Sequence, residues 1–186
     1  MNRFAALLFL ASAADIGLHL HQMAGFELGG WMNIDIEWLE EQVFLCKLSR
    51  EDSVLLDNLF VVSSYAIDDV VVKQGESGGE LFLMRSGSAR ITCDSDGEKI
   101  QVADIGEGAM FGEMSFLTGD AIRATVTVSE DSVIYSLSRR AYSELMVKNQ
   151  DLVYSLFAHM LIHAGSVIRR MNDERVALYK QMNGSA

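Results

Sequence analysis

The stretch from residue 59 to residue 138 most constrains the fold, because it consists of short β-rich runs separated by turn residues. The runs read LFVVSSYAI, DVVVKQ, ELFLMRS, SARITCD, EKIQVADI, ATVTVSE and SVIYSLS. Asp96-Gly97 lies between two of them and is a dipeptide typical of a two-residue β-hairpin turn. Many short strands joined by glycine-containing turns predict an antiparallel sandwich or barrel, of which a jelly roll fits best.

Helical periodicity flanks this β-rich stretch on both sides. Before it, the sequence predicts helices within ASAADIGLHLHQMAGF, IDIEWLEEQVFLCKL and REDSVLLDNLF, with Ser12 as the first cap. After it, RRAYSELMVKN predicts one helix, and Asp151 is a candidate cap for another. We therefore expect a mainly β fold with three parts: a helical and strand segment, the β roll with its leading helix, and the C-terminal helices, over residues 1–48, 49–138 and 139–182.

The last helix has an apolar seam with spacings of three, four or seven residues. Its members are Phe157, Met160, Ala164, Val167, Met171 and Leu178, with a gap at Glu174. The seam either packs on the β roll, or it also pairs with a second subunit or moves over a ligand. The periodicity leaves these alternatives open.

The net charge of −11 argues against nucleic acid as a partner. A surface that follows a phosphate backbone needs clustered Lys and Arg, whereas the 15 in this chain are scattered. A small anion stays possible, provided that its site supplies a local positive potential.

The two cysteines and the apolar N-terminal segment give information on the cellular compartment of the protein. Cys46 and Cys93 form no spaced pair, which favours reduced, cytosolic thiols. FAALLFLASAAD with Ala11-Ser12-Ala13 imitates a signal peptide with a small-residue cleavage site, and it is too short to span a bilayer. A strand and helix of a folded segment is the alternative interpretation.

No catalytic or metal-binding signature is found in the sequence. Four histidines lie outside residues 59–138, which argues against a metal-centred enzyme in the roll. His159 and His163 stand four apart on a helix, but no third ligand lies nearby. No nucleophile sits in a recognisable elbow, so we expect neither an enzyme nor a cofactor.

The segment FGEMSFLTGDAIRATV over residues 111–126 carries the strongest chemical signal. A short helix after Gly112 would offer free backbone N–H groups to an anion, and the glycine would let a phosphate approach closely. The guanidinium of Arg123 can donate two parallel hydrogen bonds to the oxygens of a phosphate. The carboxylate of Glu113 can accept a hydrogen bond from a hydroxyl such as the 2′-OH of a ribose. Together these groups describe a cyclic nucleotide; a surface loop with an unrelated Glu and Arg is the alternative.

FGEMSFLTGDAIRATVTV resembles the phosphate-binding cassette of cyclic-nucleotide-binding domains. The resemblance extends upstream through VVVKQGESGGELFLMRSGSARI and downstream through SVIYSLSRRAYSELMVKNQDL, and covers residues 60–180. It implies an eight-stranded jelly-roll β barrel, or β roll, with flanking helices, the last of which moves when ligand binds.

The resemblance also implies the ligand-binding residues, with Glu113 on the ribose. They are Phe111, Gly112, Glu113, Met114, Ser115, Arg123, Ala124 and Thr125. The family's common form ends Pro-Arg-x-Ala-Thr-Val, and here the place of the arginine holds Ile122, while Arg123 comes one residue late. Arg123 either reaches the phosphate through a re-formed loop or points away on the other face of its strand, because a one-residue shift reverses the side chain.

The function implied by the resemblance is a non-enzymatic regulatory module that binds a cyclic nucleotide and signals through movement of the C-terminal helix. Ala124 stands where guanine-preferring relatives often have threonine, which favours cAMP over cGMP. A homodimer through the C-terminal helix is an expected partner arrangement. The alternative is a degenerate roll that no longer binds nucleotide and serves as a structural or protein-interaction module.

The amino-terminal part shows a second resemblance. LLFLASAADIGLHLHQMAGF followed by IDIEWLEEQVF looks like the end of a STAS domain. Some sulfate-permease-like anion transporters carry a STAS domain and then a cyclic-nucleotide-binding domain on their cytoplasmic side. The resemblance implies a cytoplasmic module, a fragment or free-standing relative of that architecture, with a membrane anion transporter as its associate.

Overall fold

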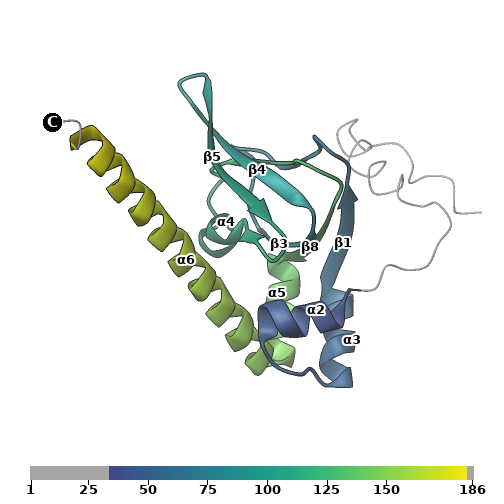
Figure 1. Cartoon of the computed structure of the whole chain (residues 1–186). Helices are drawn as coiled ribbons and strands as arrows, with labels where there is room; N and C mark the ends of the chain where they lie inside the picture. The colour runs from purple at the N-terminus through teal and green to yellow at the C-terminus, as the bar shows by residue number, and fades with distance from the viewer. Residues whose placement is uncertain (1–33, 184–186) are drawn as a thin grey trace, which may run out of the picture. The chain divides into compact units, whose positions relative to one another are not determined.

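The computed structural model describes residues 34–183, which belong to one compact unit running from Asn33 to Ala186. Its element order is helices, a block of eight strands interrupted by one short helix, and two final helices (Figure 1). The expected helix after Ser12, the signal-like stretch and most of the STAS-like segment lie outside the described residues.

Eight strands form two four-stranded antiparallel sheets, which confirms the predicted β roll with flanking helices. One sheet has the order β1-β8-β3-β6 and the other β2-β7-β4-β5. Asp96 and Gly97 both have positive φ, 55° and 83°, as the predicted two-residue hairpin between β4 and β5 requires. The strands are β1 (Phe60–Tyr65), β2 (Val70–Val72), β3 (Glu80–Ser86), β4 (Ser88–Ser95), β5 (Glu98–Gly106), β6 (Met110–Phe111), β7 (Thr125–Val128) and β8 (Ser132–Ser138).

Strand β3 is buried on both faces, because successive side chains of a strand point in opposite directions. Leu81 and Leu83 join the core cluster shared with the helices, whereas Phe82 and Met84 join a second cluster. We call this second cluster the inner cluster. It lies between the two sheets and consists of Val72, Phe82, Met84, Ala89, Phe111, Val126, Val128 and Ile134.

The helices begin where polar side chains cap them. Ser49 and Asp52 form a reciprocal capping box at the start of α3, and Ser138 accepts from the backbone N–H of Ala141 at the start of α5. The helical elements are α2 (Ile36–Leu39), the π-helical turn η1 (Glu40–Phe44), α3 (Arg50–Leu59), α4 (Glu113–Thr118), α5 (Arg139–Lys148) and α6 (Gln150–Asn183).

The prediction that Asp151 caps the last helix was wrong. The side-chain oxygen of Asn149 accepts from the backbone N–H groups of Asp151 and Leu152, each at 3.1 Å, and α6 already begins at Gln150. Asn149 is therefore the cap, because its extended backbone places its side chain over the first turn.

Among the described residues, helix α6 packs on its own chain through its N-terminal half. Leu152, Leu156 and Met160 lie in the core cluster with the helices, and every described side chain from Arg169 to Met182 is exposed. Of the expected seam, Met160 is buried and Ala164 and Val167 are half-buried, whereas Phe157, Met171 and Leu178 are exposed. By length and composition alone, Gln150–Met182 is also apolar enough to cross a membrane.

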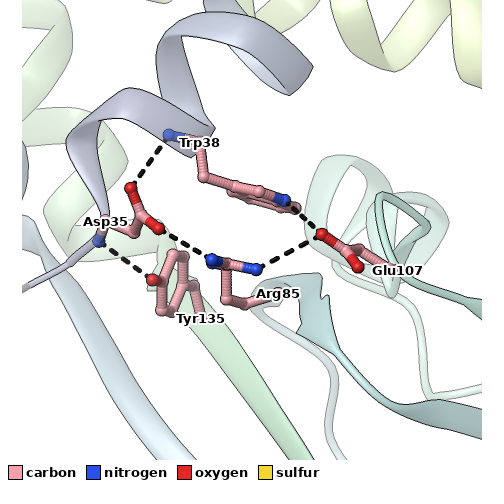
Figure 2. Close-up of polar contacts among 5 residues, drawn as sticks. All are labelled: Asp35, Trp38, Arg85, Glu107 and Tyr135. Carbon is pink, nitrogen blue, oxygen red and sulfur yellow. Dashed lines mark hydrogen bonds and ion pairs between the residues drawn. The ribbon is translucent and has the colours of Figure 1, made fainter.

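A polar network joins α2 to the β roll (Figure 2). Asp35 accepts from the guanidinium of Arg85 at 2.7 Å and caps α2 through the backbone N–H of Trp38. Glu107 accepts from Arg85 at 3.3 Å and from the indole of Trp38 at 3.0 Å. The hydroxyl oxygen of Tyr135 accepts from the backbone N–H of Asp35 at 2.9 Å. Residues 34–44 therefore pack as part of the same unit as the roll, across the boundary that the sequence placed at residue 48.

Asp35→Asn keeps a capping side chain but removes the charge that faces Arg85. The pKa of Asp35 is held below its usual range by the hydrogen bonds from the backbone of Trp38 and from Arg85. We expect a loss of less than about 1 kcal/mol in unfolding free energy at pH 7, because the pair is partly exposed. The wild-type advantage should be complete above the unfolded pKa of about 3.9 and should disappear as the pH falls through the lower folded pKa.

Urea unfolding at neutral and strongly acidic pH checks this prediction. If Asp35→Asn lowered the unfolding free energy by the same amount at neutral and at strongly acidic pH, the loss would not come from the charge of Asp35.

Candidate functional site

The turn between β6 and α4 requires a glycine. Gly112 has a φ of 80°, in the left-handed region that side chains other than glycine rarely adopt. A Cβ at this position would lie 2.8 Å from the carbonyl oxygen of Glu80 and 3.0 Å from the ring of Phe82. Because β6 pairs with β3 through Phe111 and Phe82, whose rings stack at 5.0 Å, the start of α4 is fixed against the centre of one sheet.

Glu113 is the first residue of α4, and its side chain is half-buried. Its carboxylate forms no hydrogen bond or ion pair with any other residue in the described range 34–183. A half-buried carboxylate without a partner is free to accept hydrogen bonds from a ligand. The next residue, Met114, is 63% exposed and faces solvent.

Ser115 holds α4 against the loop between β2 and β3. It is buried, and its hydroxyl donates to the carbonyl of Gly112 at 3.1 Å. A Cβ at Gly78 would lie only 2.3 Å from the Cβ of Ser115, so the loop and the helix touch without room for another atom.

Ile122 occupies the inward position at the end of the cassette. Its backbone N–H donates to the carbonyl of Glu76 at 2.9 Å, and its carbonyl accepts from Gly75 at 2.8 Å. Its side chain packs against the inner cluster. The place that the family pattern gives to an arginine is therefore filled by an apolar side chain pinned by two backbone hydrogen bonds.

Arg123 points away from this position. It is exposed, and its guanidinium has no hydrogen-bond or ion-pair partner within the part of the chain that the structure describes. Its carbonyl accepts from the thiol of Cys93 at 3.6 Å. Ala124 is half-buried, and Thr125 begins β7, where its hydroxyl accepts from the backbone N–H of Gln74 at 3.1 Å. In the described structure Arg123 is exposed, and a loop re-formed around a phosphate stays a prediction.

Arg139 is a residue of this site that sequence reasoning missed. Its guanidinium donates to the carbonyl of Ser115 at 2.9 Å and to that of Phe116 at 3.0 and 2.6 Å. A cation at the C-terminus of a helix satisfies free carbonyls and interacts favourably with the helix dipole. The only signal in the sequence is an arginine directly after the cap Ser138, and that signal does not reveal its partners.

The histidines of α6 do not form a metal centre by themselves. No group of three or more His, Cys, Asp or Glu among residues 34–183 is placed to hold a metal ion. Burial, and then the neighbouring His163, lowers the pKa of His159 below its usual range. His159 is therefore a neutral side chain at neutral pH.

The arrangement combines backbone donors at a left-handed glycine turn with an unpaired, half-buried carboxylate. Residues 111–115 contact β3, Gly78 and Arg139. Such a site can bind a hydroxylated ligand through Glu113. For a phosphate it offers N–H groups, while the described side chain at the arginine position is the apolar Ile122.

The β roll is similar in sequence to one protein family and to several known proteins. Residues 62–149 match the family model described as Cyclic nucleotide-binding domain. The chain is 25% identical over 142 residues to the cAMP-dependent protein kinase regulatory subunit of Dictyostelium discoideum, covering 75% of this chain and 43% of that protein. It is 27% identical over 128 residues to the cGMP-dependent protein kinase of Eimeria tenella, covering 69% of this chain and 12% of that protein.

Among solved structures, a cyclic nucleotide-binding domain from Methylobacillus flagellatus has the same fold. The TM-score is 0.68 at 22% identity, over 76% of this chain and 80% of that chain. The matched family consists of regulatory domains that are not themselves enzymes, although the Eimeria relative is a kinase that carries such a domain. The present chain spans less than half the length of either curated relative.

Arg139→Gln removes the charge that closes the C-terminus of α4. We expect a loss of about 1.5–3 kcal/mol in unfolding free energy, towards the low end because Arg139 remains accessible to water. Arg140→Gln is the matched control, since this neighbour is exposed and no hydrogen bond or ion pair to another described residue is found for it, and it should change stability by less than about 0.5 kcal/mol. Urea unfolding of both variants measures the difference, and equal losses would contradict the capping role.

Proposed function

Because residues 62–149 match the cyclic-nucleotide-binding domain family, we propose that this chain is a non-enzymatic regulatory module that binds a cyclic nucleotide. The observation that carries the proposal is the unpaired, half-buried carboxylate of Glu113 directly after the glycine turn at Gly112. In this proposal Glu113 accepts from the ribose 2′-OH, and the N–H groups at the start of α4 face the phosphate.

The role of Arg123 decides the affinity. To reach a phosphate inside the roll, residues 121–124 must re-form, which breaks the two backbone hydrogen bonds of Ile122 and removes its side chain from the inner cluster. This costs about 1 kcal/mol for each hydrogen bond and about 1–2 kcal/mol for the half-buried side chain. A charged partner for the phosphate returns about 2–5 kcal/mol. The two sums nearly cancel, so we propose weak binding.

The packing of Ile122 favours a second candidate function. If the re-formed loop is too costly, the roll binds no nucleotide and serves as a structural or protein-interaction module. The apolar contact with the inner cluster supports this candidate, because it closes the roll without a ligand.

Two finer aspects belong to the same proposal. Ala124 after the arginine supports cAMP over cGMP. Arg139 connects α4 to the first turn of α5, so that a shift of α4 on binding would reach α6 and change its position. A ligand achieves this only through different affinities for the two states.

The setting of the module is also proposed. Two free cysteines support a cytoplasmic location. The STAS-like start supports association with a membrane anion transporter, and the apolar residues of α6 support a homodimer.

Exchanging the side chain at the arginine position tests the proposed site. Ile122→Arg should tighten cAMP binding roughly thirty- to several-thousand-fold, the equivalent of about 2–5 kcal/mol. Arg123→Ala should weaken the wild-type affinity if Arg123 re-forms onto the phosphate, and Glu113→Gln should weaken binding in both backgrounds. Isothermal titration with cAMP, cGMP and AMP measures each dissociation constant.

The controls separate the two candidates. Binding of a cyclic nucleotide but not AMP, lost in Arg123→Ala, supports the sensor. No binding by the wild type, together with binding by Ile122→Arg, would establish the second candidate, since the fold would still form the site.

A further inference from the structure

The two segments that meet at the candidate site carry more carboxylates than cations. Residues 73–80 and 111–125 are joined by a β-bridge between Ser77 and Ala121 and by the hydrogen bond from Ile122 to Glu76. Their formal charge is −2, which has the same sign as the −11 of the whole chain and disfavours an anion. The charged residues of these segments are Glu76, Glu80, Glu113 and Asp120, against Lys73 and Arg123.

The rest of the site does little to compensate this negative charge. Helix α4 has six residues, and because a helix dipole is the sum of aligned peptide dipoles, so short a helix supplies a small partial charge. The guanidinium of Arg139 already donates to the carbonyls of Ser115 and Phe116. With Ile122 at the arginine position, a phosphate would lose hydration without meeting a cationic side chain from that position.

We propose that the site, with its loop as the structure describes it, binds an uncharged ribonucleoside. Glu113 holds the ribose, and Ile122 selects against a phosphate. This second ligand rests on the proposed function for the contact between Glu113 and a ribose. It goes beyond that function because the nucleoside uses the loop with Ile122 inside, whereas a cyclic nucleotide needs the re-formed loop with Arg123 inside.

The ribose of a nucleoside suits an unpaired carboxylate better than the ribose of a cyclic nucleotide. A carboxylate has two oxygens, and the free 2′-OH and 3′-OH of a nucleoside can each donate to one of them. In a 3′,5′-cyclic nucleotide the 3′ oxygen is esterified and has no proton to donate. The carboxylate of Glu113 is half-buried and has no partner among residues 34–183, so both of its oxygens are available.

A nucleoside also leaves the loop unchanged. The hydrogen bonds of Ile122 with Glu76 and Gly75 stay formed, and its side chain stays in contact with the inner cluster. The rearrangement of residues 121–124 that opposes cyclic-nucleotide binding is therefore absent. We expect a nucleoside to bind at least about tenfold more tightly than the corresponding cyclic nucleotide.

Met114 distinguishes a nucleoside from a free sugar, which carries the same hydroxyl groups. It follows Glu113 directly and is 63% exposed. Its flexible thioether side chain offers an adaptable apolar contact to a base. The base therefore adds to the affinity that the ribose alone supplies.

Isothermal titration of the whole chain tests the ligand class. Adenosine or guanosine should bind, and adenosine should bind at least about tenfold more tightly than cAMP. 2′-Deoxyadenosine and 3′-deoxyadenosine should each bind about tenfold or more weakly than adenosine, because each lacks one hydrogen bond to a charged group. D-Ribose should bind more weakly than either nucleoside.

Two variants with a matched control test the residues. Glu113→Gln should weaken adenosine binding about tenfold or more. Glu41→Gln is the control, since Glu41 is an exposed carboxylate of η1, and it should leave adenosine binding unchanged. Ile122→Arg should reverse the preference: it should weaken adenosine binding, because it adds a cation without an anion, and favour cAMP.

The surrounding carboxylates give an independent test. Asp120→Asn should tighten cAMP binding about two- to fivefold, since it removes an exposed negative charge, and should leave adenosine binding unchanged. For the same reason, raising NaCl from about 50 to about 500 mM should leave the dissociation constant of adenosine unchanged.

Several results would overturn the inference. These are no binding of adenosine or guanosine, affinities no higher than that of cAMP, or equal binding of adenosine and its deoxy forms. Binding of cAMP without either nucleoside contradicts this inference and leaves the proposed function standing. Binding of a nucleoside without cAMP contradicts only the cyclic nucleotide as ligand. Thermal melting of each variant confirms that the roll is folded.

Discussion

Burial of β3 on both faces is the constraint on which the rest of the structure depends. The strand is hydrogen-bonded to β8 on one side and to β6 on the other. Leu81 and Leu83 join the sheet to the helices, while Phe82 and Met84 fill the space between the two sheets. The same strand supplies the carbonyl of Glu80 that leaves no room for a side chain at Gly112. Strand β3 therefore determines both the packing of the two core clusters and the position of the candidate site.

The local features of the fold could be predicted because local residues cause them. Asp96-Gly97 fixes a hairpin through its own backbone preference, and this turn was predicted and is confirmed. The features that failed depend on residues far away in the chain. Asn149 and Asp151 are both good caps by type, and only the path of the backbone between α5 and α6 selects Asn149.

The same distinction holds for the apolar residues of α6 and for the candidate site. The sequence shows several apolar rows along this helix, but the row that the protein core covers is decided by η1, α5 and the roll. Arg139 could not be placed at α4 because its partners are backbone carbonyls, which every residue has. The pattern predicts that Glu113 binds the ligand and that Ile122 stands at the arginine position. It does not give the exposure of Arg123, which follows from the hydrogen bonds of Ile122 with Gly75 and Glu76.

Ile122 stands where the family pattern has an arginine, and this difference changes the relative stability of the ligand-free and the ligand-bound roll. A buried guanidinium without its anion would carry a desolvation penalty, and ligand binding would relieve it. With Ile122 in that place, the inner cluster is complete before any ligand arrives. A side chain that entered this position to meet a ligand would therefore have to displace Ile122 from its contact with the inner cluster.

Asn149 gives α6 the properties of a lever. While its side-chain oxygen caps α6, its amide nitrogen donates to Asp52 in α3, so one side chain fastens the start of the long helix to another element. The helix that follows has 34 residues and is therefore about 50 Å long. Beyond Met160, the last core residue of the helix, about 23 residues extend over about 35 Å, so a rotation of about 10° would move the far end by about 6 Å. A displacement at the roll too small to change its own packing would thus be mechanically amplified at the distant tip.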